Sequence, residues 1–296
     1  MTQCHRLLLC LLTLALASPA IAKKPKLAPD PAQVTEPQSP AEVPLPSDLN
    51  RASLRIAALD TLYQLDLSPD QLTALRSLVS ADPQPRTIVE GNKKLTDLFT
   101  KMQTAILSDA DDAAIAGLRN QIVDFINANN VELADAVHPT PAARTAAVNF
   151  AATLRSSQIA AFIALHADEV TDPVEQMNAA ATSIRDAKAG REAGEDQATL
   201  ITDTSTAVAA LVAGPDDAKA KPISDQVAAW LKTASALSDA DFGEREKALD
   251  DNARKIVAAP PMDVLSHWLQ LKIALLLANP ETPIAAQHMT TFRKPK

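Results

Sequence analysis

Apolar residues recur at helical spacing along almost the whole chain between residues 49 and 278. One such series is Ile115, Leu118, Ile122 and Ile126, which would line one face of an α-helix. No stretch shows the alternation typical of a half-buried strand, and the 296 residues include only six glycines. The sequence therefore predicts an all-α fold of roughly ten amphipathic helices. We expect antiparallel hairpins packed as one elongated bundle or as two helical bundles.

Several helix starts are marked by a capping side chain followed by proline, as at Ser68-Pro69 and Thr140-Pro141. The capping oxygen binds free amides of the first turn, and proline suits the first helical position. Together with the apolar spacing, these starts allow the helices to be placed along the chain. The predicted helices are 49–65, 69–81, 86–107, 109–136, 141–154, 157–169, 173–189, 195–213, 222–236, 239–258 and 262–278.

The first 22 residues have the three parts of a secretory signal peptide. Arg6 precedes an apolar run over residues 7–17, and Ala-Ile-Ala at 20–22 fits the small-x-small pattern of a signal peptidase site. Cys4 and Cys10 both lie in this segment, so the processed chain would contain no cysteine and no disulfide. We therefore expect an exported bacterial protein, located in the periplasm or outside the cell.

Composition divides the rest of the chain into further parts. Residues 23–48 contain seven prolines and few large apolar side chains, which predicts a flexible leader. Residues 49–189 and 195–278 are predicted to form two helical halves or domains, separated by the charged, glycine-containing stretch 188–196. Residues 279–296 contain three prolines and end in basic side chains, which predicts a flexible basic tail.

The chain is acidic, with a formal net charge of −8. This charge argues against nucleic acid as a partner, because such binding depends on neutralising phosphates. Basic residues gather at 23–26 and 293–296, where they would allow at most weak contact with a membrane surface. The most apolar predicted helix, 262–278, is interrupted by polar residues, so we predict a core helix there and no transmembrane helix after processing.

Familiar catalytic motifs are missing from the sequence. It contains no Gly-x-Gly-x-x-Gly, no P-loop lysine motif, no Gly-x-Ser-x-Gly elbow and no His-Glu-x-x-His. We therefore predict no cofactor, and we consider an enzyme the less favoured possibility.

Two histidines with nearby carboxylates are the candidate binding residues: His166 with Glu169, and His267 with Asp263. Each carboxylate is three or four positions from its histidine, so each pair would share a helix face. Metal sites in helical bundles use such pairs but need several converging ligands, usually from two Glu-x-x-His motifs, which this chain lacks. We therefore predict no metal site and keep the four residues as candidates for a ligand site. The alternative for His166 is a hydrogen-bonded core histidine.

The sequence Leu-Ser-Pro-Asp-Gln-Leu at 67–72 resembles the Leu-Thr-x-x-Gln motif of the exported helical proteins typified by Spy and CpxP. A looser second copy, Leu-Arg-Ser-Ser-Gln, occurs at 154–158. The resemblance rests on one six-residue motif and implies an all-helical periplasmic protein. It also implies the roles of that family, which are chaperoning and the response to envelope or metal stress.

Long amphipathic helices without a recognisable catalytic constellation favour a protein that binds other proteins. We expect an exported, non-enzymatic helical protein of the cell envelope, acting as an adaptor, scaffold or chaperone for envelope proteins. The alternative is a small-ligand or metal binder, or an enzyme, that uses carboxylates and histidines in a helical cleft. The alternative requires His166, Glu169, Asp263 and His267 to come together in space.

Overall fold

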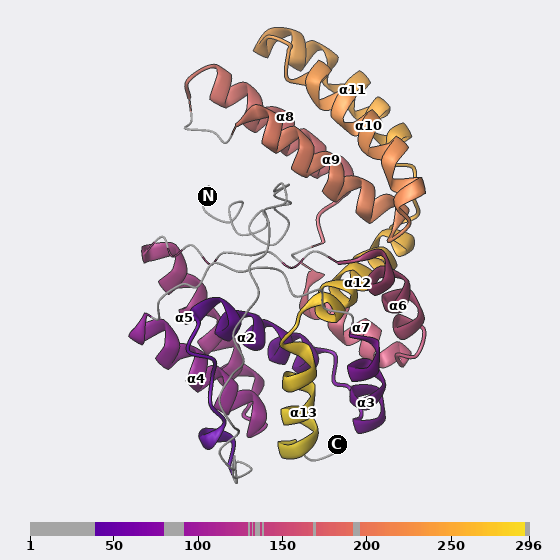
Figure 1. The fold of residues 1–296 in the computed structure, drawn as a ribbon. Coiled ribbons are helices and arrows are strands. Elements are labelled where there is room, and N and C mark those ends of the chain that lie inside the picture. The colour runs from indigo at the N-terminus through magenta and orange to yellow at the C-terminus, as the bar shows by residue number, and fades with distance from the viewer. Residues whose placement is uncertain are drawn as a thin grey trace, which may run out of the picture. The chain divides into compact units, whose positions relative to one another are not determined.

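A computed structural model of the chain describes residues 39–79, 92–129, 131, 133, 137, 139–167, 170–191 and 196–293. Twelve α-helices and one short 3₁₀ helix occur in these ranges, which contain no β-strand (Figure 1). The predicted all-α class is therefore confirmed. The predicted signal peptide and residues 23–38 of the predicted leader lie outside the described residues. The elements are η1 (Pro40–Glu42), α2 (Leu49–Gln64), α3 (Pro69–Leu78), α4 (Lys93–Leu107), α5 (Asp112–Asn129), α6 (Pro141–Ala151), α7 (Ser156–Leu165), α8 (Pro173–Lys188), α9 (Gln197–Ala213), α10 (Asp217–Ala234), α11 (Asp239–Ile256), α12 (Pro261–Ala278) and α13 (Thr282–Phe292).

The helices divide into two compact units, and the division does not follow the order of the chain. Helices α6 to α12 form unit 1, whereas η1, α2 to α5 and α13 form unit 2. Unit 1 is thus inserted into the sequence of unit 2. The boundary predicted at 188–196 is wrong, because this stretch joins α8 to α9, which pack on each other inside unit 1. A polar, glycine-containing stretch is typical of a domain linker and of a helix–helix connection alike.

Helix α10 shows how a start signal can mislead. The sequence predicts a helix beginning at residue 222, but the helix begins at Asp217. The Asp216 side chain accepts hydrogen bonds from the amides of Ala218 and Lys219, which caps the helix one turn and more before Pro222. Pro222 therefore lies inside the helix, where its missing amide removes one backbone hydrogen bond.

Part of unit 1 is a four-helix bundle formed by α8, α9, α10 and α11 (Figure 1). Its core includes Met177 and Ile184 of α8, Val208 of α9 and Trp230 of α10. Helix α11 buries Ala253 and is otherwise half-buried or exposed along its length. The bundle is therefore held mainly by α8, α9 and α10, with α11 packed on its side.

The rest of unit 1 is organised around α12. This helix packs against α6, α7 and α9 and buries a nearly continuous apolar surface that includes Trp268, Ile273 and Leu277. An α-helix that is apolar on most of its circumference is expected in a protein core. The core position predicted for this helix is therefore confirmed.

The predicted leader is wrong for its last ten residues, 39–48. Val43 is buried, and its carbonyl oxygen accepts a hydrogen bond of 2.8 Å from the Gln103 side-chain amide. The Pro44 carbonyl oxygen accepts another, of 3.1 Å, from the Arg55 guanidinium. Proline removes backbone donors but leaves carbonyl acceptors, so side-chain donors can still fix such a segment.

The predicted flexible tail over 279–296 is also wrong for most of its length. Residues 282–292 form α13, which packs on α2 and α4 and buries Ala285, Ala286 and Met289. Prolines at 280 and 283 are as typical of a flexible end as of a helix start. Pro283 instead lies in the first turn, where a missing amide costs nothing.

Both copies of the glutamine motif form helix starts. At α3 the Ser68 hydroxyl accepts from the Gln71 amide at 3.2 Å, and the Gln71 side chain accepts from the Ser68 amide at 2.9 Å. This reciprocal pair is a capping box. At α7 the Gln158 side chain accepts from the Arg155 amide at 2.9 Å. In both copies the glutamine therefore has a local role, which is to close the first turn.

His288 of α13 makes the stability of unit 2 depend on pH. Burial, with a further contribution from the charge of Arg55, lowers the pKa of His288 below its usual value. The unfolded chain binds a proton near pH 6.5, whereas the folded chain resists it until lower pH. The free energy of unfolding should therefore fall as the pH drops from about 7 toward the lowered pKa. Urea unfolding of the wild type and of His288→Gln at about pH 7.5 and about pH 5.5 checks this; equal pH dependence in both proteins would contradict it.

Candidate functional site

Helix α7 has no charged residue over Ser156–Leu165, a property that it shares only with α13 among the described α-helices. Its sequence is Ser-Ser-Gln-Ile-Ala-Ala-Phe-Ile-Ala-Leu, so apolar residues continue around the helix after the first turn. A helix with apolar residues on all sides is expected to be covered on all sides. The neighbours of α7 therefore determine which of its sides are buried and which are exposed.

The structure covers one side of α7. Of its ten residues, all of which are described, only Gln158 and Phe162 are buried. Ala161 and Ala164 are exposed, and Leu165 exposes 56% of its surface. The helix thus presents an uncharged, apolar outer face, formed by Ala160, Ala161, Ala164 and Leu165, which we call the α7 face.

The other side of α7 rests on aromatic rings of α12. Phe162 and His166 lie 4.6 Å apart between ring centroids, and Trp268 lies 5.6 Å from Phe162 and 5.4 Å from His166. The Lys272 ammonium lies 5.2 Å from the centre of the Trp268 ring. Tilted ring pairs at these separations attract one another, and a cation over an indole adds to this. The α7 face is therefore backed by a packed aromatic cluster.

Large exposed apolar side chains occur in the same part of unit 1. Among the described residues, the large hydrophobic side chains that are exposed are Val148 of α6, Leu165 of α7 and Met262 of α12. Met262 exposes 70% of its surface. Helices α6 and α7 both pack on α12. Scattered exposed apolar residues are normal. Of the three, Leu165 belongs to the α7 face, where exposed alanines adjoin it.

The candidate ligand residues that the structure describes have different partners. His166 lies at the end of α7 against Trp268, as a half-buried member of the aromatic cluster. His267 lies on α12, next to Trp268 in the sequence. Its Nδ1 makes a hydrogen bond of 3.0 Å with the Leu211 carbonyl oxygen at the end of α9. Asp263 is exposed in the first turn of α12. Glu169 lies outside the described residues.

Nothing in the described part of the chain brings metal ligands together. No group of three or more His, Cys, Asp or Glu side chains there lies close enough to hold an ion. Since His267 is held by a backbone carbonyl and His166 by aromatic rings, packing and hydrogen bonding account for both positions.

The place of His267 explains one glycine. Gly214 ends α9 with φ +69° and ψ −155°, a conformation almost confined to glycine. A Cβ atom at this position would lie 2.7 Å from Cδ2 of His267. Gly214→Ala should therefore lower the free energy of unfolding by about 1–3 kcal/mol from the backbone, with the clash adding to it. Gly190→Ala is the matched control, since Gly190 also has positive φ but open space around it; equal losses for the two variants in urea unfolding would contradict the role given to His267.

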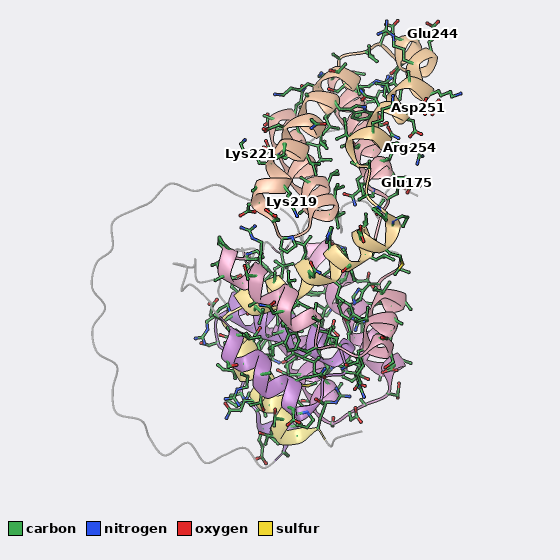
Figure 2. The ribbon with its side chains drawn as sticks, turned by 90° about the vertical axis from the view of Figure 1, so that its right-hand side faces the viewer. Glu175, Lys219, Lys221, Glu244, Asp251 and Arg254 are labelled. Atoms are coloured by element: carbon green, nitrogen blue, oxygen red, sulfur yellow. The ribbon has the colours of Figure 1, made fainter. Side chains whose placement is uncertain are left out.

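Charged side chains cover the four-helix bundle instead. Figure 2 shows Glu175, Lys221, Glu244 and Arg254 on its outer surfaces, where both signs of charge alternate. Such mixed, exposed charge is the usual surface of a helical bundle and points to no particular partner.

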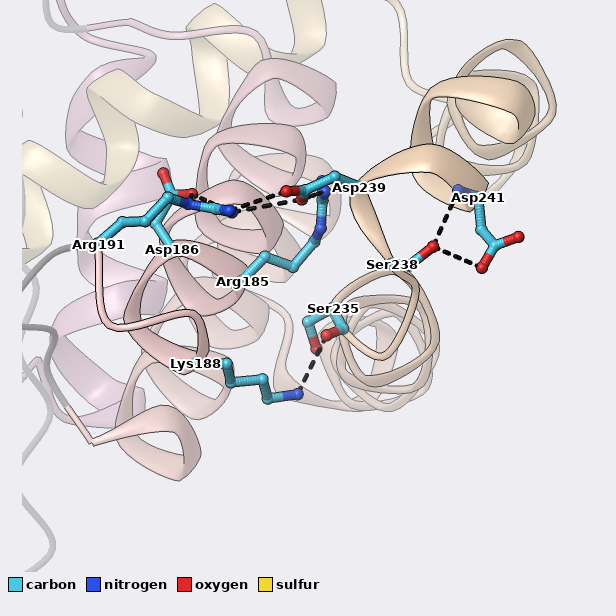
Figure 3. A network of polar contacts seen from close by, with 8 residues as sticks. All are labelled: Arg185, Asp186, Lys188, Arg191, Ser235, Ser238, Asp239 and Asp241. Carbon is cyan, nitrogen blue, oxygen red and sulfur yellow. Dashed lines mark hydrogen bonds and ion pairs between the residues drawn. The ribbon is translucent and has the colours of Figure 1, made fainter.

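A network of ion pairs joins the end of α8 to the start of α11 (Figure 3). Arg191 donates to Asp239 and to Asp186, both at 2.8 Å, and the hydrogen bond from Arg191 lowers the pKa of Asp239. Arg185 also pairs with Asp239, and its guanidinium lies 4.1 Å from the centre of the Phe242 ring. These cations are matched by carboxylates within the network. We therefore interpret the network as ion pairs that stabilise the packing of α8 against α11.

The sequence itself contains a signal for the α7 face. Residues 156–165 contain no charge, in a chain in which 22% of the residues are charged. The ligand site predicted from two histidines and their neighbouring carboxylates does not include this stretch. Among the described residues, no single helix is long and apolar enough to cross a membrane; α6 and α7 meet that test only together, and they are bent by 117°.

Comparison with known proteins returned no match, either to a family model, to a curated protein or to a solved structure. The function of the chain is therefore argued from its own residues.

Proposed function

We propose that this chain is an exported, non-enzymatic helical protein of the cell envelope that binds other proteins through the α7 face. It would act as an adaptor, scaffold or chaperone. The observation that carries this proposal is the uncharged helix α7, whose outer residues, including Ala161 and Leu165, are exposed.

The chemistry of the α7 face suits a protein partner. Buried centres of protein interfaces are poor in charge and rich in apolar and aromatic side chains. The α7 face has no charge to desolvate, and the rings of Phe162 and Trp268 support it from below. Because its alanines are small, a partner helix can approach the backbone closely.

The expected location comes from the sequence. The segment 1–22 has the parts of a signal peptide, and the motif at 67–72 resembles that of Spy and CpxP. Both features support an envelope protein, and the family resemblance favours a chaperone or stress role. The binding proposal itself depends on α7 and does not require the resemblance.

A crosslinked pull-down from a native envelope extract tests the proposal. The tagged wild type from Lys23 onward is compared with the double variant Ala161→Glu/Leu165→Glu, which places two carboxylates on one side of the α7 face. Burying an unpaired charge is unfavourable, so proteins bound through this face should be lost from the variant. One stoichiometric partner would indicate an adaptor, and many unfolded clients would indicate a chaperone.

Ala229→Glu is the matched control, because Ala229 is an exposed alanine of α10 outside the α7 face. Circular dichroism and urea unfolding should show that both variants remain folded like the wild type. The proposal fails if the wild type binds no envelope protein, or if the α7 variant and the α10 variant retain the same bound proteins.

A further inference from the structure

The C-terminal helix α13 is held at its first end by buried charge. Glu281, which precedes α13, is 2% exposed and accepts hydrogen bonds from Arg51 at 2.8 Å and from Arg55 Nε at 2.9 Å. Arg55 is 6% exposed and also donates to the Pro44 carbonyl oxygen. Charge-assisted hydrogen bonds with this geometry fix the position and direction of the carboxylate.

The second end of α13 is held by a different set of charges. Arg293 donates to Asp109 at 3.1 Å and lies 3.8 Å from Asp66, and its guanidinium lies 4.8 Å from the centre of the Tyr63 ring. Asp66 and Asp109 have φ values of +46° and +54°, and no other described non-glycine residue has positive φ. Two turns of unit 2 therefore adopt an uncommon backbone where they meet Arg293.

The two ends together make a directional recognition site. We call the residues that hold α13, namely Arg51, Arg55, Asp66 and Asp109, the clasp. An acidic residue binds at one end of the clasp and a basic residue at the other. The twelve positions from Glu281 to Arg293 correspond to about 18 Å of helix. The clasp therefore selects a helix that has an acidic residue before its first turn and a basic residue twelve positions later, as α13 has.

The covalent attachment of α13 lies in the other unit. Helix α12 of unit 1 ends at Ala278, and residues 279–281 link it to α13. All the residues of the clasp belong to unit 2. The contacts that hold α13 would therefore be the same whether the helix came from the same chain or from another copy.

We propose that α13 is exchangeable and that two copies of this chain associate by placing α13 of each in the clasp of the other. Exchange of a terminal element reuses existing contacts, so it needs no new interface. Attachment through a short link gives α13 an effective concentration of about 1 mM for its own clasp, so the closed single chain prevails in dilute solution. The exchanged dimer forms when chains fold at high concentration or when pairing within one chain is penalised.

Charge reversal provides the test with two full chains. One copy carries Arg51→Glu and Arg55→Glu, and the other carries Glu281→Arg. Each copy alone places like charges together at the first end of α13. In the mixture, exchange restores the native Arg51–Glu281–Arg55 contacts in one clasp and gives opposite charges with reversed signs in the other. The mixture should elute as a 1:1 dimer with twice the mass of one chain by light scattering, and each copy alone should remain a single chain.

A matched control reverses an ion pair in which no residue of α13 takes part. Arg119 makes two hydrogen bonds to Asp60, at 2.8 and 2.7 Å, within the continuous part of unit 2. Asp60→Arg mixed with Arg119→Glu should give no dimer. The proposal is overturned if the clasp mixture stays at the mass of one chain, or if the control mixture dimerises equally.

If a charge-reversed variant fails to fold, refolding of the wild type at two concentrations provides a second test. After refolding from denaturant at about 1 mM chain, a dimer should be present that is missing after refolding at about 1 µM. A wild type that refolds to the mass of one chain at both concentrations overturns the proposal. This result is independent of the pull-down with the α7 face.

Discussion

Glu281→Ala should lower the free energy of unfolding by about 3–5 kcal/mol. The reason is that alanine leaves the Arg55 guanidinium buried without the carboxylate that neutralises it. Arg51 loses the same partner, but it is half exposed, so water can replace the carboxylate there. Urea unfolding followed by circular dichroism measures the loss. Hydrogen exchange should show α13 opening first, because its first anchor is gone.

A double variant separates the unpaired charge from the packing. Arg55→Met/Glu281→Leu removes both charges and keeps apolar volume, so it should be much less destabilised than Glu281→Ala alone. Asp60→Asn is a second comparison, because the Asp60–Arg119 pair is more exposed and its loss should cost less. Equal losses for Glu281→Ala and Asp60→Asn would show that burial of the Arg55 charge is not what matters.

Trp230→Ala should cost about 3–5 kcal/mol in the free energy of unfolding, through the cavity that it leaves in the four-helix bundle. Trp230 is 4% exposed, and its indole N–H donates to the Leu249 carbonyl oxygen of α11 at 3.1 Å. Because α11 fully buries Ala253 alone among its residues, it depends on Trp230 more than the other helices do. Hydrogen exchange should therefore show the amides of α11 losing protection before those of α8 and α9.

Trp230→Phe provides the graded comparison. Phenylalanine keeps most of the apolar volume but cannot donate to Leu249, so the loss should be nearer 1–2 kcal/mol. In Trp230→Ala, a loss of protection that is equal in α8, α9, α10 and α11 would contradict the special dependence of α11 on Trp230.

Local signals predicted the helices well, whereas pairing between distant helices could not be read from the chain. The start of α6 at Thr140-Pro141 and the capping box at Ser68 depend on neighbouring residues, so spacing was enough to find them. The packing of α13 on α2 depends on Glu281 meeting Arg55, which is 226 residues away in sequence. Nothing local marks that pairing, so the sequence does not distinguish the last helix from a flexible tail.

The candidate site was predicted less well, for a related reason. His166 and His267 attracted attention by residue type, but the hydrogen bond of His267 to Leu211 is set by how α12 packs on α9. The uncharged sequence of α7 was visible from the start. Whether another helix covers its outer residues depends on packing between distant parts of the chain. In the described structure Leu165 stays exposed.

The insertion of unit 1 between α5 and α13 imposes an order of events on a chain that is made from its N-terminus. About 150 residues separate Asn129 from Thr282, and at ordinary synthesis rates they take about 8–30 s to appear. During that interval the earlier helices of unit 2 exist without their last partner, while unit 1 can already be complete. A chain that stops short of Arg293 would therefore contain a complete unit 1 and an incomplete unit 2. Unit 2 is therefore complete only once α13 is present.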